Sequence, residues 1–337
     1  MLKRDVGASW WSMGLSDSGA LFSAAGYYDT LFNIQTASID LKTGKLTTPP
    51  VEAVSTFVGA NLYPVWSPDG KYLAYQSRRN GVGTRHFVIG IRSVDTGAIR
   101  EIIPSPNFEL FTGLQWTPDG RSFVVLGRGA KGIVGAFQVD AQTGRSQLLV
   151  ENAYITALMP ADGRKLYFAR RIGSGANFQI ALMEKDLASG TEKELLRKPR
   201  LNNFQMSPDG KMITVGVVPS AESGNRASEI LAFPTSGGEP SVLFRADGAQ
   251  AVAVLTWMPD SRSVQILKVI TPQSWERWTV PIDGGAPTKL EAAPVTGAIP
   301  QPFRLHPDGK QVALQVQAPR RPEEVWALEN FLPKGGN

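Results

Sequence analysis

Two histidines, His86 and His306, come nearest to metal-binding or acid–base chemistry in this sequence. Zinc and other transition-metal sites use about three or four ligands, drawn mainly from His, Cys and carboxylates. His306 stands directly before Pro307 in a repeated turn motif, which predicts a turn residue. His86 opens an expected strand, where an exposed or stacking side chain is expected. These positions are unrelated, so the sequence predicts no metal site, and we expect no other cofactor.

The motifs that support covalent or nucleotide chemistry are missing or lack their structural context. The chain has no Cys, which excludes thiolate catalysis and Cys-ligated metals. It also has no G-x-S-x-G nucleophile elbow of the kind that serine peptidases of the α/β class use. Residues 127–132, GRGAKG, match G-x-G-x-x-G but lead into a strand rather than a helix, so they predict a hairpin loop. Nothing brings the carboxylates of Asp247, Glu323 and Glu324 together. We therefore expect no enzyme.

Arginine carries most of the charge in seven segments that we assign to loops. These segments contain eleven Lys and Arg residues and six Asp and Glu residues, a surplus equal to the net charge of +5 of the whole chain. Arg presents a planar fork of donors that suits carboxylates and phosphates, and aromatic residues are enriched at interfaces. The candidate binding residues are Arg78, Arg79, Arg128, Arg170, Arg171, Trp275 and Arg277. The alternative is that these loops are polar only because they face water.

A repeat supplies the elements that would position these loops. Its clearest copies read WSPDGKYLAYQS, WTPDGRSFVVLGR and MSPDGKMITVGVV. The turn aspartates are Asp17, Asp69, Asp119, Asp162, Asp209, Asp260 and Asp308, and successive markers lie 43 to 52 residues apart. Pro sets φ for a type I turn, Asp bonds to the backbone two residues on, and Gly takes the left-handed position. The strand after each turn alternates as a sheet packed on both faces would.

A second turn, such as DLKTGK at residues 40–45, follows about 25 residues after the first in most copies. Each period then holds four short strands, and four-stranded units at a period of 40–50 residues are typical of propeller blades. The sequence predicts an all-β fold with one domain over residues 1–337, a seven-bladed β-propeller of four-stranded blades. Six blades plus an N-terminal extension is the alternative. A pair of β-sandwiches with accidental turns is the competing architecture.

The repeat also predicts how the ring closes, where its tryptophans are buried and which turn residues have positive φ. Residues 2–6 are expected to complete the last blade and so remove an exposed sheet edge. Trp66, Trp116 and Trp257 recur three residues before the turn Asp and should be buried between neighbouring blades. The turn glycines Gly70, Gly120, Gly163, Gly210 and Gly309 should have positive φ, and Ser261, which replaces Gly in one copy, should be strained or differ.

The charge and the apolar content of the chain limit the classes of partner that we expect. The pI near 9.4 is only mildly basic for 337 residues, and a nucleic-acid-binding protein usually concentrates more charge on one face. We therefore expect no specific nucleic-acid partner. No stretch approaches the roughly 18 apolar residues of a membrane span, and no apolar segment follows the basic start as in a signal peptide.

Blades with W-S-P-D-G-K turns, as in residues 66–71, resemble those of the TolB-like β-propeller superfamily. The resemblance covers nearly the whole chain, and the terminal EEVWALENFLP is similar to the end of C-terminal propellers in bacterial signalling proteins. The resemblance implies a sensory or interaction domain of the kind found in larger signalling proteins, and a periplasmic or other extracytoplasmic location.

In a propeller the turns between the second and third strands of every blade emerge on one face, which would gather the arginine-rich loops. We expect a binding domain that holds a peptide, a protein or an anionic small ligand on this face. The alternative is a lyase or hydrolase that acts on a polyanionic sugar in the central channel.

Overall fold

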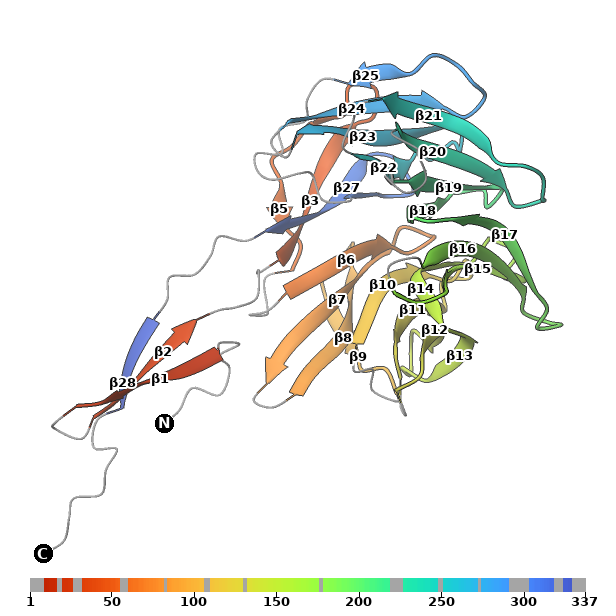
Figure 1. The fold of residues 1–337 in the computed structure, drawn as a ribbon. Helices are drawn as coiled ribbons and strands as arrows, with labels where there is room; N and C mark the ends of the chain where they lie inside the picture. Colours follow the sequence, from red (N-terminus) through yellow and green to blue (C-terminus); the bar gives the residue numbers. More distant parts are fainter. Residues whose placement is uncertain are drawn as a thin grey trace, which may run out of the picture.

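The computed structural model describes most of the chain, with gaps at the termini and in several loops. The described residues are 9–16, 20–26, 32–54, 60–81, 84–105, 110–129, 132–175, 178–218, 227–247, 251–271, 274–290, 303–317 and 324–328. Their secondary structure consists of β-strands joined by turns, and no α-helix occurs among them. Figure 1 shows six blades arranged in a ring, with a separate three-stranded sheet lying to one side.

The ring contains five regular four-stranded blades whose strands pair in chain order. Blade 1 comprises β6 (Ala60–Trp66), β7 (Tyr72–Gly81), β8 (Thr84–Ser93) and β9 (Ile99–Ile102), and blade 2 comprises β10 (Leu110–Trp116), β11 (Ser122–Arg128), β12 (Val134–Asp140) and β13 (Ser146–Glu151). Blade 3 comprises β14 (Ala153–Leu158), β15 (Lys165–Ile172), β16 (Gln179–Asp186) and β17 (Glu192–Lys198). Blade 4 comprises β18 (Leu201–Met206), β19 (Met212–Val217), β20 (Ala227–Pro234) and β21 (Ser241–Asp247), and blade 5 comprises β22 (Ala251–Trp257), β23 (Ser263–Thr271), β24 (Ser274–Pro281) and β25 (Thr288–Leu290).

Blade 6 combines the two ends of the chain. It takes β26 (Phe303–Leu305) and β27 (Gln311–Gln317) from the C-terminal part, and β3 (Phe32–Asp40) and β4 (Lys45–Leu46) from the N-terminal part. The short β5 (Val51–Glu52) also pairs with β3. The β27–β3 pairing runs from Gln311 opposite Ser38 to Gln317 opposite Phe32. This ladder closes the ring.

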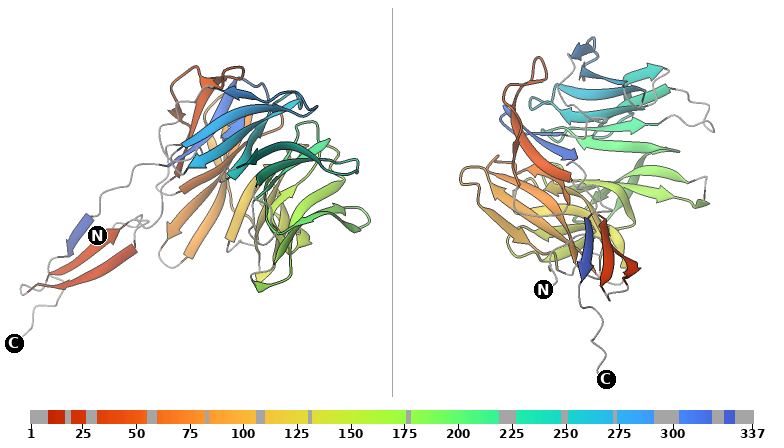
Figure 2. Two further views of the ribbon diagram at one scale, coloured as in Figure 1. Left: turned by 45° about the horizontal axis from the view of Figure 1, so that its top comes forward. Right: turned by 90° about the vertical axis from the view of Figure 1, so that its left-hand side faces the viewer.

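The prediction of seven blades is wrong, and the six-bladed alternative is confirmed. The strands β1 (Ser9–Leu15), β2 (Leu21–Gly26) and β28 (Glu324–Leu328) form a sheet in the order β1-β2-β28. This sheet lies apart from the ring in Figure 1 and in the left view of Figure 2. A seventh blade needs β2 beside β3 and β27 beside β28, but β2 pairs with β28 and β27 pairs with β3. Asp17 and residues 2–6, expected to mark the first blade and to complete the last, lie outside the described residues.

The turn predicted from the repeat has the expected geometry. Gly70, Gly120, Gly163, Gly210 and Gly309 have φ between +64° and +72°. In the first ring blade the Ser67 hydroxyl donates to Asp69 at 2.6 Å, and the Lys71 N–H donates to the same carboxylate at 3.0 Å. Ser261, which replaces the turn glycine in blade 5, has φ +58°. The turn therefore keeps its left-handed conformation, which is strained for a residue that has a Cβ.

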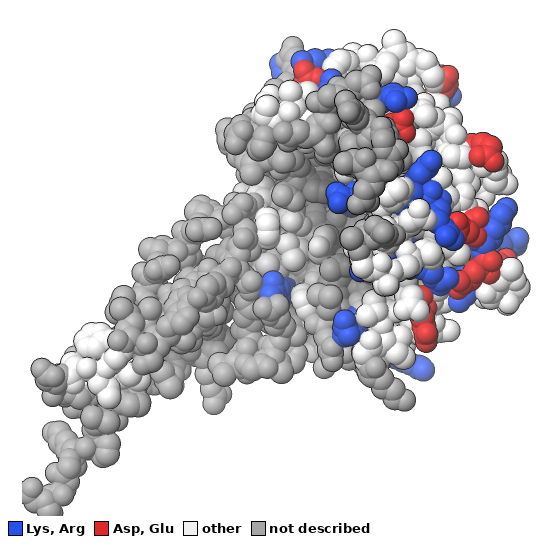
Figure 3. All heavy atoms as spheres, in the orientation of Figure 1, with Lys and Arg blue, Asp and Glu red and all other residues white. Residues whose placement is uncertain are grey.

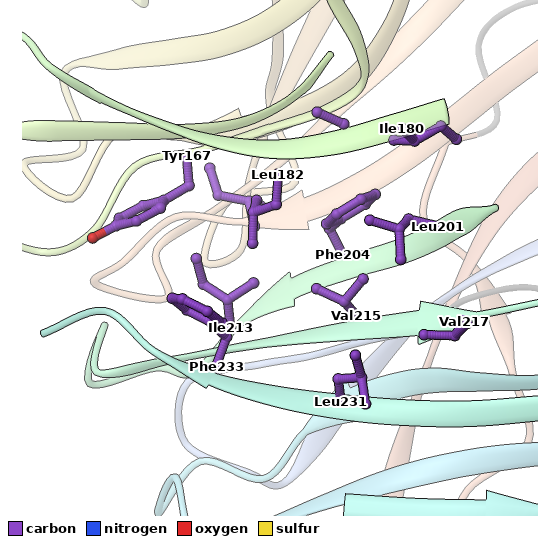
Figure 4. Close-up of a cluster of buried hydrophobic side chains, with 12 residues drawn as sticks. Tyr167, Ile180, Leu182, Leu201, Phe204, Ile213, Val215, Val217, Leu231 and Phe233 are labelled. Atoms are coloured by element: carbon purple, nitrogen blue, oxygen red, sulfur yellow. The ribbon is translucent and has the colours of Figure 1, made fainter. Parts of the chain in front are cut away.

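Apolar side chains fill the space between adjacent blades. Figure 4 shows this for blades 3 and 4, where Tyr167 and Leu182 face Phe204 and Ile213. The repeated tryptophans lie at such boundaries, with Trp66, Trp116 and Trp257 only 5–7% exposed. The Trp66 indole donates to the Arg304 carbonyl at 2.9 Å, and the Trp116 indole donates to the Val65 carbonyl at 3.3 Å. The prediction that these residues are buried between blades is confirmed.

Replacing Trp116 by Ala should lower the free energy of unfolding by roughly 3–5 kcal/mol, because it removes a buried aromatic side chain and leaves a cavity between two blades. Urea denaturation measures this change. The control is Tyr72→Ala, since Tyr72 is 40% exposed and its loss should cost much less. Equal losses in the two variants would contradict the packing role.

Alanine substitutions at two turn glycines distinguish the stability cost of backbone strain from that of a steric clash. A Cβ on Gly70 would lie 2.6 Å from the His306 ring, whereas a Cβ on Gly163 meets nothing within 4 Å. Both residues have positive φ, so Gly163→Ala should cost about 1 kcal/mol from strain alone. Gly70→Ala should cost clearly more, as measured by thermal unfolding. A cost for Gly163→Ala equal to or above that for Gly70→Ala would be inconsistent with this contact.

Acid should destabilise the ring through its turn aspartates. The hydroxyl of Ser67 and the N–H of Lys71 hold the pKa of Asp69 below its usual value, and Thr117 acts in the same way on Asp119. A carboxylate whose pKa is depressed in the folded state stabilises it above the unfolded pKa of about 4, and this contribution disappears as pH falls through the folded pKa. Asp69→Asn should therefore be less stable than the parent at neutral pH and lose less stability on acidification. Parallel pH–stability curves would contradict this.

Candidate functional site

The innermost strands of all six blades enclose a central channel. Residues of β6, β10, β14, β18, β22 and β26 line a cavity of about 930 Å³. Turn residues such as Ser67, Pro118 and Pro208 also line it, so the cavity extends to the face that carries the PDG turns. Its size lies at the upper end of the roughly 300–1,000 Å³ typical of small-ligand sites.

A bulge interrupts the inner strand of several blades beside this cavity. The register shifts between Leu62 and Val65 in β6, and equivalent shifts occur in β10, β14, β18 and β22. Tyr63, Ile155 and Asn203 have φ of +48° to +59° in these segments and line the cavity. Left-handed conformations cost non-Gly residues of order 1–3 kcal/mol and concentrate at ligand-binding sites. The bulges place Tyr63 and Ile155 with 40% and 44% of their surface exposed.

The residue four positions before each turn Asp contributes to the channel wall in every ring blade. These residues are Val65, Gln115, Leu158, Gln205, Thr256 and Arg304. Gln205 donates to the Val254 carbonyl of the next blade at 2.8 Å. The side-chain oxygen of Gln115 is buried and has no hydrogen-bond partner. The wall therefore combines apolar side chains with amide and hydroxyl groups.

Arg304 brings a positive charge into this wall. Its side chain is accessible only in part, and the surrounding protein lowers its pKa by desolvation. Its guanidinium makes one long hydrogen bond, from Nη1 to the Phe303 carbonyl at 3.4 Å. The described lining of the cavity contains neither Asp nor Glu. The channel thus holds a cation without a carboxylate beside it.

His306 also lines the cavity, but its ring nitrogens are engaged. Nε2 lies 2.9 Å from the Gly70 carbonyl and Nδ1 lies 2.8 Å from the Asp308 carboxylate. The ring packs edge-on against Trp66 with the centroids 4.8 Å apart. The prediction that His306 is a turn residue is confirmed, and the structure adds a link from blade 6 to blade 1. The His86 side chain lies outside the described residues.

Most predicted binding arginines lie at the face opposite the PDG turns. Arg78, Arg128, Arg170 and Arg171 are near the ends of second strands, each of which begins directly after a turn. Arg79 pairs with His86 in the β7–β8 ladder, but its side chain lies outside the described residues. The described lining of the cavity extends to the PDG turns instead and includes none of these arginines. The predicted arginines are therefore separate from the described channel lining.

The described arginines on this face have neighbours of their own. Arg170 forms a 2.6 Å ion pair with Glu192, and its guanidinium lies over the Phe168 ring. The guanidinium of Arg171 lies 4.1 Å from the centroid of Phe178. In Figure 3 basic side chains alternate with acidic ones over the described part of the visible surface. These contacts leave the predicted binding role of the arginines untested, and they show that Arg170 does not contribute an unpaired charge.

Arg277, predicted as an exposed binding residue of a loop, is instead buried in the structure. It is 3% exposed and donates to the Gly44 carbonyl at 3.0 Å and to the Gln265 side-chain oxygen at 2.5 Å. Burial lowers its pKa to about 10. The segment around Arg277 that the sequence assigned to a loop is mostly strand, because β24 begins at Ser274. Through its hydrogen bond to Gly44, Arg277 connects blade 5 to blade 6. Trp275 is also partly buried, against the core between these two blades.

Sequence reasoning missed Arg304. Alignment of the repeats on their turn aspartates places it where the other ring blades have Val, Gln, Leu, Gln and Thr. This substitution of a neutral residue by a cation was a signal available from the sequence. The structure was needed to show that the position lines the channel. Among the described residues no group of three or more His, Cys, Asp or Glu could hold a metal ion, and no helix could cross a membrane.

No protein-family model and no curated protein matches this chain. Solved structures do. A putative TolB from Agrobacterium tumefaciens is 18% identical, with a TM-score of 0.61 over 86% of this chain and 99% of the other. An oligogalacturonate lyase from Vibrio parahaemolyticus is 12% identical, with a TM-score of 0.53 over 90% of this chain and 76% of the other. A puromycin-hydrolyzing peptidase from Mycobacterium tuberculosis is 14% identical, with a TM-score of 0.53 over 82% of this chain and 47% of the other.

These similarities concern the fold, because all three identities are low. In this chain the fold consists of four-stranded blades in a ring of six that the two ends of the chain close together. The chain has the fold of a TolB-like β-propeller.

Proposed function

We propose that this chain is a non-catalytic binding module that holds a peptide, a protein or an anionic small ligand at its central channel. The observation that carries the proposal is the cavity of about 930 Å³ to which all six blades contribute. Binding sites are concave, mostly apolar and provided with a few polar groups that fix orientation. Leu114, Leu158 and Phe204 supply apolar wall here, and Gln115 and Arg304 supply polar groups.

The backbone of the channel supports the same proposal. Three non-Gly residues with positive φ occur in bulges along its wall, at a cost that a purely structural inner strand has no reason to bear. Bulges redirect side chains, and those at Tyr63 and Ile155 leave large side chains exposed beside the cavity. We interpret the bulges as the means by which the ring shapes the channel for a ligand.

The alternative is a propeller lyase or hydrolase that acts on a polyanionic sugar in the same channel. The neighbours include both a TolB and an oligogalacturonate lyase, so the fold is compatible with either class. The observation that favours the alternative is Arg304, since a cation in the channel also suits the carboxylate of an acidic sugar. Consumption of a bound sugar over time would distinguish the enzyme from the binding module.

Two further proposals concern the surroundings of the domain. From its resemblance to signalling propellers, we propose that the chain is the sensory part of a larger protein with an extracytoplasmic location. Binding of a ligand at the ring would then have to be transmitted to another module of that protein.

A screen of small organic anions and a random peptide library against the purified chain tests the proposed function. For the hits, Gln115→Trp should weaken binding by roughly tenfold or more, because the larger side chain occupies channel volume. The control is Val134→Trp, which introduces the same side chain at a 40% exposed position of the same blade. Isothermal titration measures the affinities.

A third variant distinguishes the two faces. If hits lose affinity in Arg171→Glu, and keep it in Gln115→Trp, the ligand site lies on the arginine face and the channel proposal is wrong. If Arg171→Glu and the equivalent reversal Arg121→Glu at the PDG face weaken binding equally, only general electrostatic attraction is at work. Such attraction would also fall as salt rises.

A further inference from the structure

We infer that the channel ligand is a small organic monocarboxylate, and that its carboxylate binds the guanidinium of Arg304. This inference rests on the proposed function and names the ligand class of the same site. Nothing in the similarity to other propellers assigns a role to this position.

An arginine in the protein interior without a carboxylate partner costs stability. Removing a cation from water carries a penalty of several kcal/mol unless an opposite charge or several acceptors compensate. Arg304 has a single hydrogen bond of 3.4 Å to the neighbouring carbonyl. Within the described chain no ion pair involves it. Most of its donors are therefore available to a group that enters the channel.

Arg277 provides the internal comparison. Both arginines are desolvated enough for burial to lower their pKa values, and both lie near Phe303. Arg277 has good acceptors in Gly44 and Gln265, as expected of a structural residue. Arg304 lacks them and faces a cavity instead. This contrast assigns the two guanidinium groups to different tasks.

The geometry and charge of the channel select the ligand. A guanidinium binds a carboxylate through two parallel hydrogen bonds. Arg304 is the one Lys or Arg in the described lining, and His306 is already engaged with Gly70 and Asp308. A ligand with one negative charge is therefore matched, whereas a phosphate dianion would leave a charge uncompensated. Apolar walls such as Val65, Leu158 and Phe204 suit an aliphatic or aromatic body.

The backbone holds this group in place. The indole of Trp66 donates to the Arg304 carbonyl at 2.9 Å across the boundary between blades 6 and 1. On the other side Arg304 pairs with Ala313 in β27. Contacts with β6 and β27 thus hold the strand that carries Arg304 in place. Because the strand is already ordered, less conformational entropy is lost when a ligand binds.

The first measurement is the stability of two matched variants without ligand. Arg304→Met should melt at the same temperature as the parent or higher, because it removes a charge that lacks compensation. Arg277→Met should melt at a lower temperature, because it breaks two buried hydrogen bonds. A large fall for Arg304→Met would show that Arg304 is structural and would overturn the inference.

The second measurement is ligand binding, with phenylpropanoate, decanoate and the primary amide of each as probes. We expect the acids to raise the melting temperature and the amides to raise it much less. Arg304→Gln should weaken binding of the acids by roughly 10- to 100-fold, and Arg304→Lys should retain part of the affinity. Arg171→Gln, which removes a cation from the opposite face, should have no effect.

The outcomes separate this inference from the proposed function. Equal binding of acids and amides, unchanged in Arg304→Gln, would overturn the carboxylate but leave a channel ligand. Tighter binding of phenyl phosphate than of phenylpropanoate, dependent on Arg304, would replace the carboxylate by a phosphate. If no acid binds, the inference is wrong, and the effect of Gln115→Trp on hits from the peptide library decides separately whether the channel binds anything.

Discussion

The contact between blade 6 and blade 1 is the constraint on which the whole ring depends. Every blade buries one face against the next, so an open ring would expose two apolar faces to water. The seam buries Ile34 and Ala313 of blade 6 against Leu73 and Trp66 of blade 1. The ladder between β27 and β3 makes this possible, because it supplies blade 6 with its outer strands. Closure thus couples the two ends of the chain to the geometry of the channel.

The same seam also organises the candidate site. The Trp66 indole spans it to reach the Arg304 carbonyl, and the His306 ring spans it to reach Gly70. Both contacts fix the inner strand of blade 6 relative to that of blade 1. Because Arg304 lies on this strand, the position of the channel cation depends on ring closure rather than on one blade alone. A ligand at Arg304 would in turn stabilise the closed ring by mass action.

The two desolvated arginines show how one residue type can meet different surroundings in neighbouring blades. Arg277 satisfies acceptors that belong to two blades and adds a cation–π contact with Phe303. Arg304 is left with a single long hydrogen bond and lines the same cavity as the strained bulge residues Tyr63 and Ile155. Natural proteins tolerate such local costs mainly where a site needs them. The stability of the ring therefore comes from its blade boundaries, and its capacity to bind comes from the channel that they enclose.

The sequence by itself determined the blade, because its signals are local. The PDG turn, the left-handed glycines and the buried position of Trp66 follow from residues close together in the chain, and Ser261 kept the turn at the expected strain. Only the tertiary structure decided the number of blades, since β2 and β27 both lack a third strand and nothing local says whether β3 or β28 supplies it. It also decided that Arg277 is buried and that Arg304 faces the channel. Exposure depends on which residues meet across a boundary, and these can be far apart in the chain, as are Arg277 and Gly44, which are 233 residues apart.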